Sequence, residues 1–428
     1  MRQTTQRSKP HIRRQTALLL LLALLLTMLP GLPAAAEEEH DVRTITISAV
    51  GDCTLGRSHV MDYYKSFDHV YDKMGRAYFL KNVASIFRSD DLTIANLEGV
   101  LSESAKRRST FFRQKKGKID RKQYSHLGRP EYARILTKGG VDVVSFANNH
   151  NIDYGRQGFS DTVDACASCG LGICYYDTVV RREIQGLTVG VLSVDATYCS
   201  REVAEEFLRA GMAELNRDCD LTVVCMHWGE NYKKKASREQ VELGHLCIEL
   251  GADLVLGCHA HILQGVERYK GRYIFYSLAN FCYGGRLIPK DVDTVIAQQT
   301  FTFVDGELQI DDNVRLIPCW MSGREDLNDY SPVVKTGEEA GRILKTINSR
   351  SKRFGVKFDA EGRPKIDPAE DTEVQSAEPA DEALTPKKIP DIIRVLLDTG
   401  SWEQKKSGTI TSEESYDKEE KSDKGDKK

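Results

Sequence analysis

The 428-residue sequence lacks an excess of either charge. It contains 60 basic and 63 acidic residues, which gives a formal net charge of −3. A chain that attracts nucleic acid through its overall electrostatic field needs a strongly positive balance. We therefore expect no nucleic acid among its partners.

Long apolar runs are also lacking, except near the N-terminus. Residues 1–36 contain a basic segment, MRQTTQRSKPHIRRQ, then the apolar TALLLLLALLLTML, then PGLPAAA. This order is typical of a secretory signal cleaved near Ala36, and the run is shorter than the roughly 20 residues of a spanning helix. An uncleaved membrane anchor is the alternative. Both interpretations predict a protein secreted from the cell, or anchored on the outer side of the cytoplasmic membrane.

The eleven cysteines lack the even number and regular spacing of a disulfide framework. Cys166, Cys169 and Cys174 form a C-x2-C-x4-C cluster that resembles a metal or redox motif, but no second cluster supports a zinc ribbon. Cys53 and Cys258 lie in or beside apolar, strand-like runs. We interpret most of the cysteines as buried free thiols, which behave as small apolar side chains.

Strand-like and helix-like segments alternate through residues 43–350. The strand-like ones are Arg43–Val50, Asp91–Asn96, Val141–Asn148, Thr188–Asp195, Asp220–His227, Ala252–His259 and Arg272–Asn280. Apolar strands that alternate with helices predict an α/β domain with a largely parallel or mixed sheet covered by helices. After Phe301, the segment FTFVDGELQI predicts a hairpin that turns at Asp-Gly, and TGEEAGRILKTINSR predicts a terminal helix.

The composition changes again in residues 362–428. The segment begins acidic and rich in Pro and Ala, and it ends in charged low-complexity sequence. Such a composition cannot bury enough apolar surface to fold, so we expect a largely disordered tail. Within it, KIPDIIRVLLDTGSW predicts a short amphipathic helix at residues 389–398.

Polar side chains follow most of the strand-like segments. They are Asp52, Asn96, Glu98, Asn148, Asn149, His150, Asp153, His227, Glu230, His259, His261 and Asn280. Ligands of open α/β sheets bind outside the carboxyl ends of the strands, so these side chains should meet in one crevice. Their oxygen and imidazole donors suit Mn, Fe, Zn or Mg, and no thiolate is required. The donors outnumber the needs of one tetrahedral ion, whereas two ions about 3.5–4 Å apart would use them.

The motifs occur in the order GD, NLEG, NNHxxDxG, HWGxNY, GADLVLGxHxHxLQ and YSLxNF. This ordered set resembles the CapA/PgsA family of capsule and poly-γ-glutamate synthesis proteins over roughly residues 44–319. That family is similar in fold to the calcineurin-like metallophosphoesterases. The resemblance implies a metallophosphatase-like, four-layer α/β/β/α sandwich with mixed sheets over residues 43–350.

The resemblance also implies a set of metal ligands. Asp52 and His261 would bind a first divalent ion, Asn149, His227 and His259 a second, and Glu98 would bridge the two. The sequence departs from metallophosphoesterases at Thr54, which occupies the position of a ligand histidine, and at Glu98, which replaces an aspartate. The first ion would therefore have one imidazole fewer.

The resemblance also assigns residues to the reaction itself. By the same resemblance, His150 would act near the leaving group as an acid or electrostatic stabiliser, with Asp153 as its catalytic partner. The residues expected to contact substrate are Asn96, Arg57, Glu230 and Asn280.

Two functions follow from the resemblance. The first is an exported, metal-dependent hydrolase of the phosphoesterase type that acts in the synthesis of a cell-envelope polymer. The second is a non-catalytic component of capsule polymer assembly or export, which keeps the fold for polymer binding. In both, the implied partners are an anionic polymer such as poly-γ-glutamate and the membrane-bound capsule synthesis machinery.

Overall fold

The computed structural model describes residues 40–58, 61–103 and 125–365. The segment 1–36 and the helix expected at 389–398 lie outside these residues. No helix within the described part of the chain is long and apolar enough to cross a membrane. The chain divides into two units at Asp41 and Val42, and the fold below is that of the second unit.

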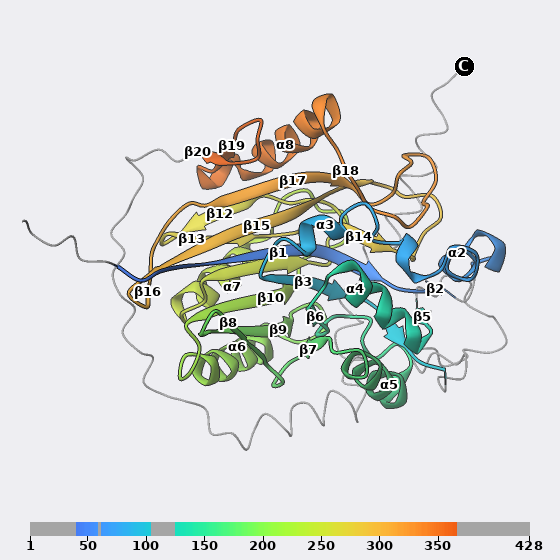
Figure 1. The fold of residues 1–428 in the computed structure, drawn as a ribbon, viewed down its shortest axis with the longest axis horizontal. Helices are drawn as coiled ribbons and strands as arrows, with labels where there is room; N and C mark the ends of the chain where they lie inside the picture. Colours follow the sequence, from blue (N-terminus) through green and yellow to red (C-terminus); the bar gives the residue numbers. More distant parts are fainter. Residues whose placement is uncertain (1–39, 59–60, 104–124, 366–428) are drawn as a thin grey trace, which may run out of the picture. The chain divides into compact units, whose positions relative to one another are not determined.

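The larger sheet has the order β18-β17-β15-β1-β3-β6-β7 (Figure 1). Its parallel half consists of β1 (Val42–Thr54), β3 (Leu92–Leu97), β6 (Val143–Ser145) and β7 (Gly172–Cys174). Its antiparallel half consists of β15 (Asp293–Val304), β17 (Val314–Trp320) and β18 (Val333–Val334). Two short strands join its flanks, β14 (Asn280–Tyr283) beside β1 and β16 (Glu307–Leu308) beside β15. The sheet is therefore mixed.

The smaller sheet has the order β12-β13-β11-β10-β9-β8. Its parallel strands are β9 (Leu187–Asp195), β10 (Leu221–His227), β11 (Leu254–Cys258) and β13 (Arg272–Phe275). The edge strands β8 (Val180–Ile184) and β12 (Val266–Tyr269) pair antiparallel with their neighbours. Both sheets thus contain a run of parallel strands whose carboxyl ends lie at one edge.

Three apolar clusters define the layers of the fold. The cluster between the sheets takes Leu92 and Ile94 from β3 together with Val189 from β9. The alternate residues of β3, Ala95 and Leu97, enter a second cluster under the helices that cover the larger sheet. A third cluster joins the outer face of the smaller sheet to its own helices. The order helix, sheet, sheet, helix confirms the predicted four-layer α/β/β/α sandwich.

The covering helices differ between the two sheets. Those that enter the cluster of the larger sheet are α2 (Phe67–Met74), α3 (Ala84–Phe87), α4 (Ala133–Gly139) and α5 (Gly155–Ala167). The smaller sheet is covered by α6 (Arg201–Leu215) and α7 (Arg238–Glu249). The predicted terminal helix is α8 (Gly337–Ser351), which adds Ile343 and Leu344 to the core between the sheets (Figure 1).

Two short sheets complete the fold. One has the order β2-β5-β4, formed by β2 (Arg57–Ser58), β5 (His126–Gly128) and β4 (Val100–Leu101). The other pairs β19 (Lys357–Phe358) with β20 (Pro364–Lys365), so ordered structure continues past residue 362, where the tail was expected to begin. All eleven cysteines are free thiols, and most of them are buried.

The predicted strand Arg272–Asn280 is wrong as a single element. β13 ends at Phe275 in the smaller sheet, and β14 begins at Asn280 in the larger one. The chain crosses between the sheets here, and Ala279 has a positive φ of 64°. The apolar pattern does not reveal the break because both strands and their connection are buried.

The predicted hairpin between β15 and β16 is confirmed. Val304 pairs with Glu307, and the two turn residues, Asp305 and Gly306, have φ values of 54° and 87°. Two positive φ angles are characteristic of the type I′ turn that Asp-Gly favours, because its twist matches that of the strands.

The crossing predicts the effect of a substitution at Gly51. A Cβ atom there would lie 1.8 Å from the Ala279 carbonyl oxygen, so Gly51→Ala must displace the backbone of β1 or of the crossing. We expect a loss of about 3 kcal/mol in the free energy of unfolding, measured by urea denaturation. Gly341→Ala in α8 is the matched control, because its Cβ would meet no atom within 4 Å. A loss that is no larger for Gly51→Ala than for the control would contradict the expectation.

Candidate metal centre

The polar residues that follow the strands of both sheets meet in one cluster. Asp52, Glu98 and His150 come from the ends of β1, β3 and β6 in the larger sheet. His227 ends β10 of the smaller sheet, and His259 and His261 follow β11. Asp52 and Glu98 are fully buried, and the three histidines of the smaller sheet are at most 8% exposed. The structure thus brings together the six residues that carry the candidate chemistry.

Glu98 occupies the middle of this cluster. Its Oε1 atom lies 3.7 Å from His227 Nε2, 3.8 Å from His261 Nε2 and 3.9 Å from His150 Nε2. These distances are too long for hydrogen bonds, and Oε1 has no hydrogen-bond partner among the residues that the structure describes. A buried, unpaired carboxylate oxygen surrounded by imidazole nitrogens is expensive by itself, and a cation would compensate for that cost.

Asp52 shows the same feature. Its Oδ1 atom accepts a hydrogen bond of 2.7 Å from Asn96 Nδ2, whereas its Oδ2 atom is buried and has no hydrogen-bond partner in the described part of the chain. Oδ2 lies 3.4 Å from His261 Nδ1. The cluster therefore contains two buried carboxylates, each with one oxygen left unpaired.

The ligand atoms fall into two overlapping groups. Glu98, His227 and His259 form one group, Asp52, Glu98 and His261 form the other, and the atoms within each lie within 4.8 Å of one another. Glu98 belongs to both, as expected of a bridging ligand. Asn149 joins the first group, since its Oδ1 atom is 2.7 Å from His227 Nε2. Such a set of oxygen and imidazole donors fits one or two divalent cations.

Burial and neighbouring charges shift the pKa values of four members of the cluster. Burial, reinforced by the charge of Asp52, raises the pKa of Glu98 to about 7. Burial also lowers the pKa values of His227 and His259 well below the usual range, which leaves neutral imidazoles that can bind a metal. Burial opposes the charged form of His261, but Glu98 and Asp52 outweigh it and raise its pKa to about 9.

The backbone of the His-x-His segment is held in an unusual conformation. His259 and His261 have φ values of 92° and 55°, in the region that non-glycine residues seldom occupy. Such conformations persist only where the surrounding structure enforces them, and they cluster at functional sites. Both imidazoles belong to the groups of candidate ligand atoms.

Asn96 and Asn280, expected to contact substrate, lie beneath the ligands. Asn96 Nδ2 donates to Asp52 and lies 3.3 Å from His227 Nδ1, while its Oδ1 accepts from Ser145 Oγ at 2.9 Å. Asn280 Oδ1 is 2.8 Å from His261 Nδ1. Their contacts orient Asp52, His227 and His261. In metal sites such outer contacts fix the tautomer and the direction of the ligand.

His150 is oriented by Asp153. The Asp153 Oδ2 atom lies 2.8 Å from His150 Nδ1 and also accepts the backbone N–H of His126 at 3.0 Å. Nδ1 therefore carries a proton toward Asp153, and Nε2 remains on the side of Glu98. The structure places Asp153 behind His150, as a residue that positions the imidazole.

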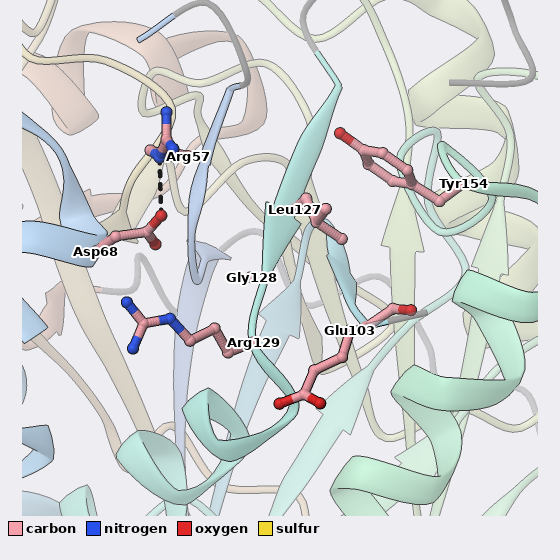
Figure 2. A pocket seen from close by; sticks show the side chains of 8 residues that line it. Arg57, Asp68, Glu103, Leu127, Gly128, Arg129 and Tyr154 are labelled. Carbon is pink, nitrogen blue, oxygen red and sulfur yellow. Dashed lines mark hydrogen bonds and ion pairs between the residues drawn. The ribbon is translucent and has the colours of Figure 1, made fainter. Parts of the chain in front are cut away.

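Arg57 and Glu230 do not join the cluster. Arg57 donates from Nε to Asp68 Oδ2 at 2.8 Å and from a terminal nitrogen to the Met61 carbonyl at 2.6 Å. It lines a separate cavity of about 280 Å³, shown in Figure 2, in which Tyr154 lies on the opposite side of β5. Glu230 is mostly exposed, 3.7 Å from Lys233 Nζ.

Thr54 and His126 are further neighbours of the cluster. Thr54 is fully buried and donates from Oγ1 to Glu98 Oε2 at 3.2 Å, so it holds the shared carboxylate. The His126 ring lies 4.8 Å from that of His150. The place of Thr54, two residues after Asp52, already indicated that it lies near the expected ligands, but His126 belongs to no motif of the sequence.

The sequence matches the family described as bacterial capsule synthesis protein PGA_cap over residues 46–284, more than half of the chain. The chain belongs to this family. Among its relatives, the capsule biosynthesis protein CapA of Bacillus anthracis is 26% identical over 308 residues, which cover 66% of this chain and 71% of that protein. The PGA biosynthesis protein CapA of Bacillus subtilis is 27% identical over 258 residues, which cover 56% of this chain and 63% of that protein.

Solved structures with a partly similar fold include proteins named as phosphatases or nucleotidases. A phosphatase from Mycoplasma pneumoniae has a TM-score of 0.38 and 13% identity, and the match covers 65% of this chain and 94% of that one. A 5'-nucleotidase from Candida albicans has a TM-score of 0.38 and 10% identity, and the match covers 73% of this chain and 59% of that one.

The shared carboxylate predicts opposite effects on stability and on metal binding. In metal-free protein at pH 8, Glu98→Gln removes the repulsion with Asp52, so we expect the free energy of unfolding to rise, on the order of 1–3 kcal/mol. The gain should shrink at pH 5, below the raised pKa, where Glu98 is already protonated. Conversely, added Mn should stabilise only the parent protein, by about 2.7 kcal/mol at 100 times its Kd. Thermal unfolding with chelator measures the stability of the metal-free proteins, and unfolding with added Mn measures the stabilisation by metal. Equal stabilisation of the parent and of Glu98→Gln by Mn would refute the bridging role.

Thr54 provides a more conservative test of the same site. Thr54→Val removes the hydroxyl that donates to Glu98 and keeps the volume of the side chain. We expect metal affinity to fall about 10–100-fold, because outer contacts of ligands have effects of this size. Thr300→Val, which removes a hydroxyl paired with Thr46 elsewhere in the larger sheet, should leave affinity unchanged. Metal titration followed by calorimetry distinguishes these outcomes, and equal affinities in both variants would exclude a role for Thr54.

Proposed function

We propose that this protein is an exported, metal-dependent hydrolase of the phosphoesterase type that acts in the synthesis of an anionic envelope polymer such as poly-γ-glutamate. The observation that carries the proposal is the position of Glu98, whose unpaired oxygen lies at the overlap of two groups of metal-binding side chains. Membership of the PGA_cap family supports the biological process.

The residues of the chain divide the work of holding metal. Asp52 and His261 would hold one cation, His227, His259 and Asn149 the other, and Glu98 would contact both. Divalent cations at these positions supply positive charge that stabilises the negative charge developing on substrate oxygens. Asn96 and Asn280 keep the ligands aligned, so little reorganisation is needed when the reaction begins.

His150 is the residue that would handle a proton. Asp153 binds its Nδ1, which directs Nε2 toward the side of Glu98 where a substrate would lie. When the ring is the doubly protonated imidazolium, Nε2 can give its proton to the leaving oxygen or stabilise its charge. Burial opposes this charged form, but Asp153 outweighs it and raises the pKa of His150. Asp153 contributes by fixing the tautomer of the ring.

The location of the reaction rests on the sequence of residues 1–36. Its basic, apolar and small-residue segments support export or anchoring on the outer side of the cytoplasmic membrane. There the protein would meet the polymer and the membrane-bound machinery that makes it. N-terminal sequencing of the protein isolated from cells tests the export step, and it separates a cleaved signal from an anchor.

The hydrolase proposal predicts distinct effects for two sets of variants. His150→Asn should retain bound metal but hydrolyse p-nitrophenyl phosphate about 10²–10⁴-fold more slowly, because it removes the proton donor alone. The double variant His259→Ala/His261→Ala should lose both metal and turnover. Metal content by mass spectrometry and steady-state kinetics with added Mn measure the two properties. A parent protein with neither bound metal nor turnover would refute the proposal.

One observation favours a second function, a non-catalytic component of polymer assembly or export. Thr54 stands where the resemblance expects a ligand histidine, so the group of Asp52, Glu98 and His261 contains a single imidazole. A centre that is weak on this side could bind an anionic polymer through one cation without cleaving it. Metal binding and polymer binding without turnover would favour this function over the first.

A further inference from the structure

Tyrosine hydroxyls in the core of this protein have hydrogen-bond partners. Buried tyrosines usually need one, because an unpaired hydroxyl in an apolar setting costs free energy. Five examples are Tyr132 with Asp68, Tyr176 with Asn151, Tyr273 with Asp312, Tyr276 with Glu267 and Tyr330 with the Lys65 carbonyl. Tyr283 is different. It is only 6% exposed, yet its hydroxyl has no hydrogen bond to any of the described residues.

Tyr283 lies beside the candidate metal centre. Its ring centroid is 5.5 Å from that of His261 and 6.1 Å from that of His126. His126 in turn packs against His150 at 4.8 Å. The tyrosine ring is therefore placed between the ligand side of the centre and the side of the expected proton donor.

The position of the hydroxyl itself can be fixed through Gly285. A Cβ atom on Gly285 would lie 2.5 Å from the Tyr283 hydroxyl oxygen and 2.9 Å from His126 Cε1. The Tyr283 hydroxyl oxygen and His126 Cε1 therefore both border the space that a side chain at position 285 would fill. The hydroxyl lies at the end of the His126 ring, and only a residue without a side chain leaves room for this arrangement.

The fold holds Tyr283 rigidly. Tyr283 belongs to β14, where it is paired with Thr54 of β1, two residues after the candidate ligand Asp52. Its carbonyl oxygen accepts a hydrogen bond of 2.6 Å from Asn328 Nδ2. A fixed ring with a free hydroxyl donor is what a preorganised substrate contact requires, because nothing must be broken or reordered when the ligand arrives.

We propose that Tyr283 is a substrate-contacting residue whose hydroxyl donates a hydrogen bond to an anionic oxygen of the substrate, either phosphoryl or carboxylate. A phenol suits this position because it donates without adding a charge that would compete with the cations. The inference deepens the proposed function, but it depends only on the binding of an anion at the centre and not on hydrolysis.

The experiment compares Tyr283→Phe, which removes only the hydroxyl, with the parent protein. In Mn-loaded protein, calorimetric titration with inorganic phosphate should show binding about 10-fold weaker or more, the effect of losing a hydrogen bond to a charged group. A parallel titration with acetate tells whether a carboxylate is the preferred ligand. Tyr71→Phe is the matched control, because Tyr71 packs on Tyr132 away from the cluster, and it should bind as the parent does. Metal content should be the same in all three proteins.

The outcomes separate this inference from the proposed function. Weaker binding of either anion by Tyr283→Phe supports the inference, even if the parent protein shows no turnover and the hydrolase proposal fails. Unchanged binding of both anions in Tyr283→Phe, or a metal-loaded parent that binds neither, overturns the inference. Turnover by the parent together with unchanged anion binding in the variant would leave the hydrolase proposal standing and remove Tyr283 from the site.

Discussion

Two buried carboxylates, Asp52 and Glu98, impose the main physical constraint on this structure. Each keeps one oxygen without a hydrogen bond to any described residue, and burial makes negative charge there costly. The surrounding residues reduce the cost only in part, through Asn96 on Asp52 and Thr54 on Glu98. Protons or cations must supply the rest. The raised pKa of Glu98 is the metal-free form of the same balance.

The sandwich can compensate the two buried carboxylates because its two sheets contribute different metal-binding groups. The larger sheet provides the carboxylates at the ends of β1 and β3, whereas the smaller sheet provides the imidazoles at the ends of β10 and β11. The crossing from β13 to β14 ties the sheets together at this place, since the Ala279 carbonyl accepts the backbone N–H of Asp52 at 2.9 Å. The position of Asp52 is thus coupled to the same segment that places Asn280 against His261.

The sequence was sufficient to predict the layers of the fold, because apolar strands alternating with helices leave few other solutions. It also predicted that Asp52, Glu98 and the His-x-His pair would meet, since carboxyl ends of parallel strands share an edge. It could not predict that Asn96 would lie beneath the ligands or that Thr54 would support Glu98. Those roles depend on which way a buried side chain points, and a bulge between Val50 and Asp52 resets that direction. Tyr283 lies just past the last motif, so no pattern marks it.

The two halves of the centre differ in ways that bear on its chemistry. His227, His259 and the amide of Asn149 surround one side of Glu98, whereas the other side has Asp52 and a single imidazole, His261. More nitrogen donors favour borderline metals such as Zn or Fe, and more oxygen donors favour harder ions such as Mn or Mg. The two sides of such a centre would therefore differ in the divalent metal that they prefer. On the side of Asp52 and His261, Thr54 stands where a second histidine would be expected. Tyr283 packs against His261 on this same side. A neutral hydrogen-bond donor at that point would help to hold an anionic substrate where the metal contributes least.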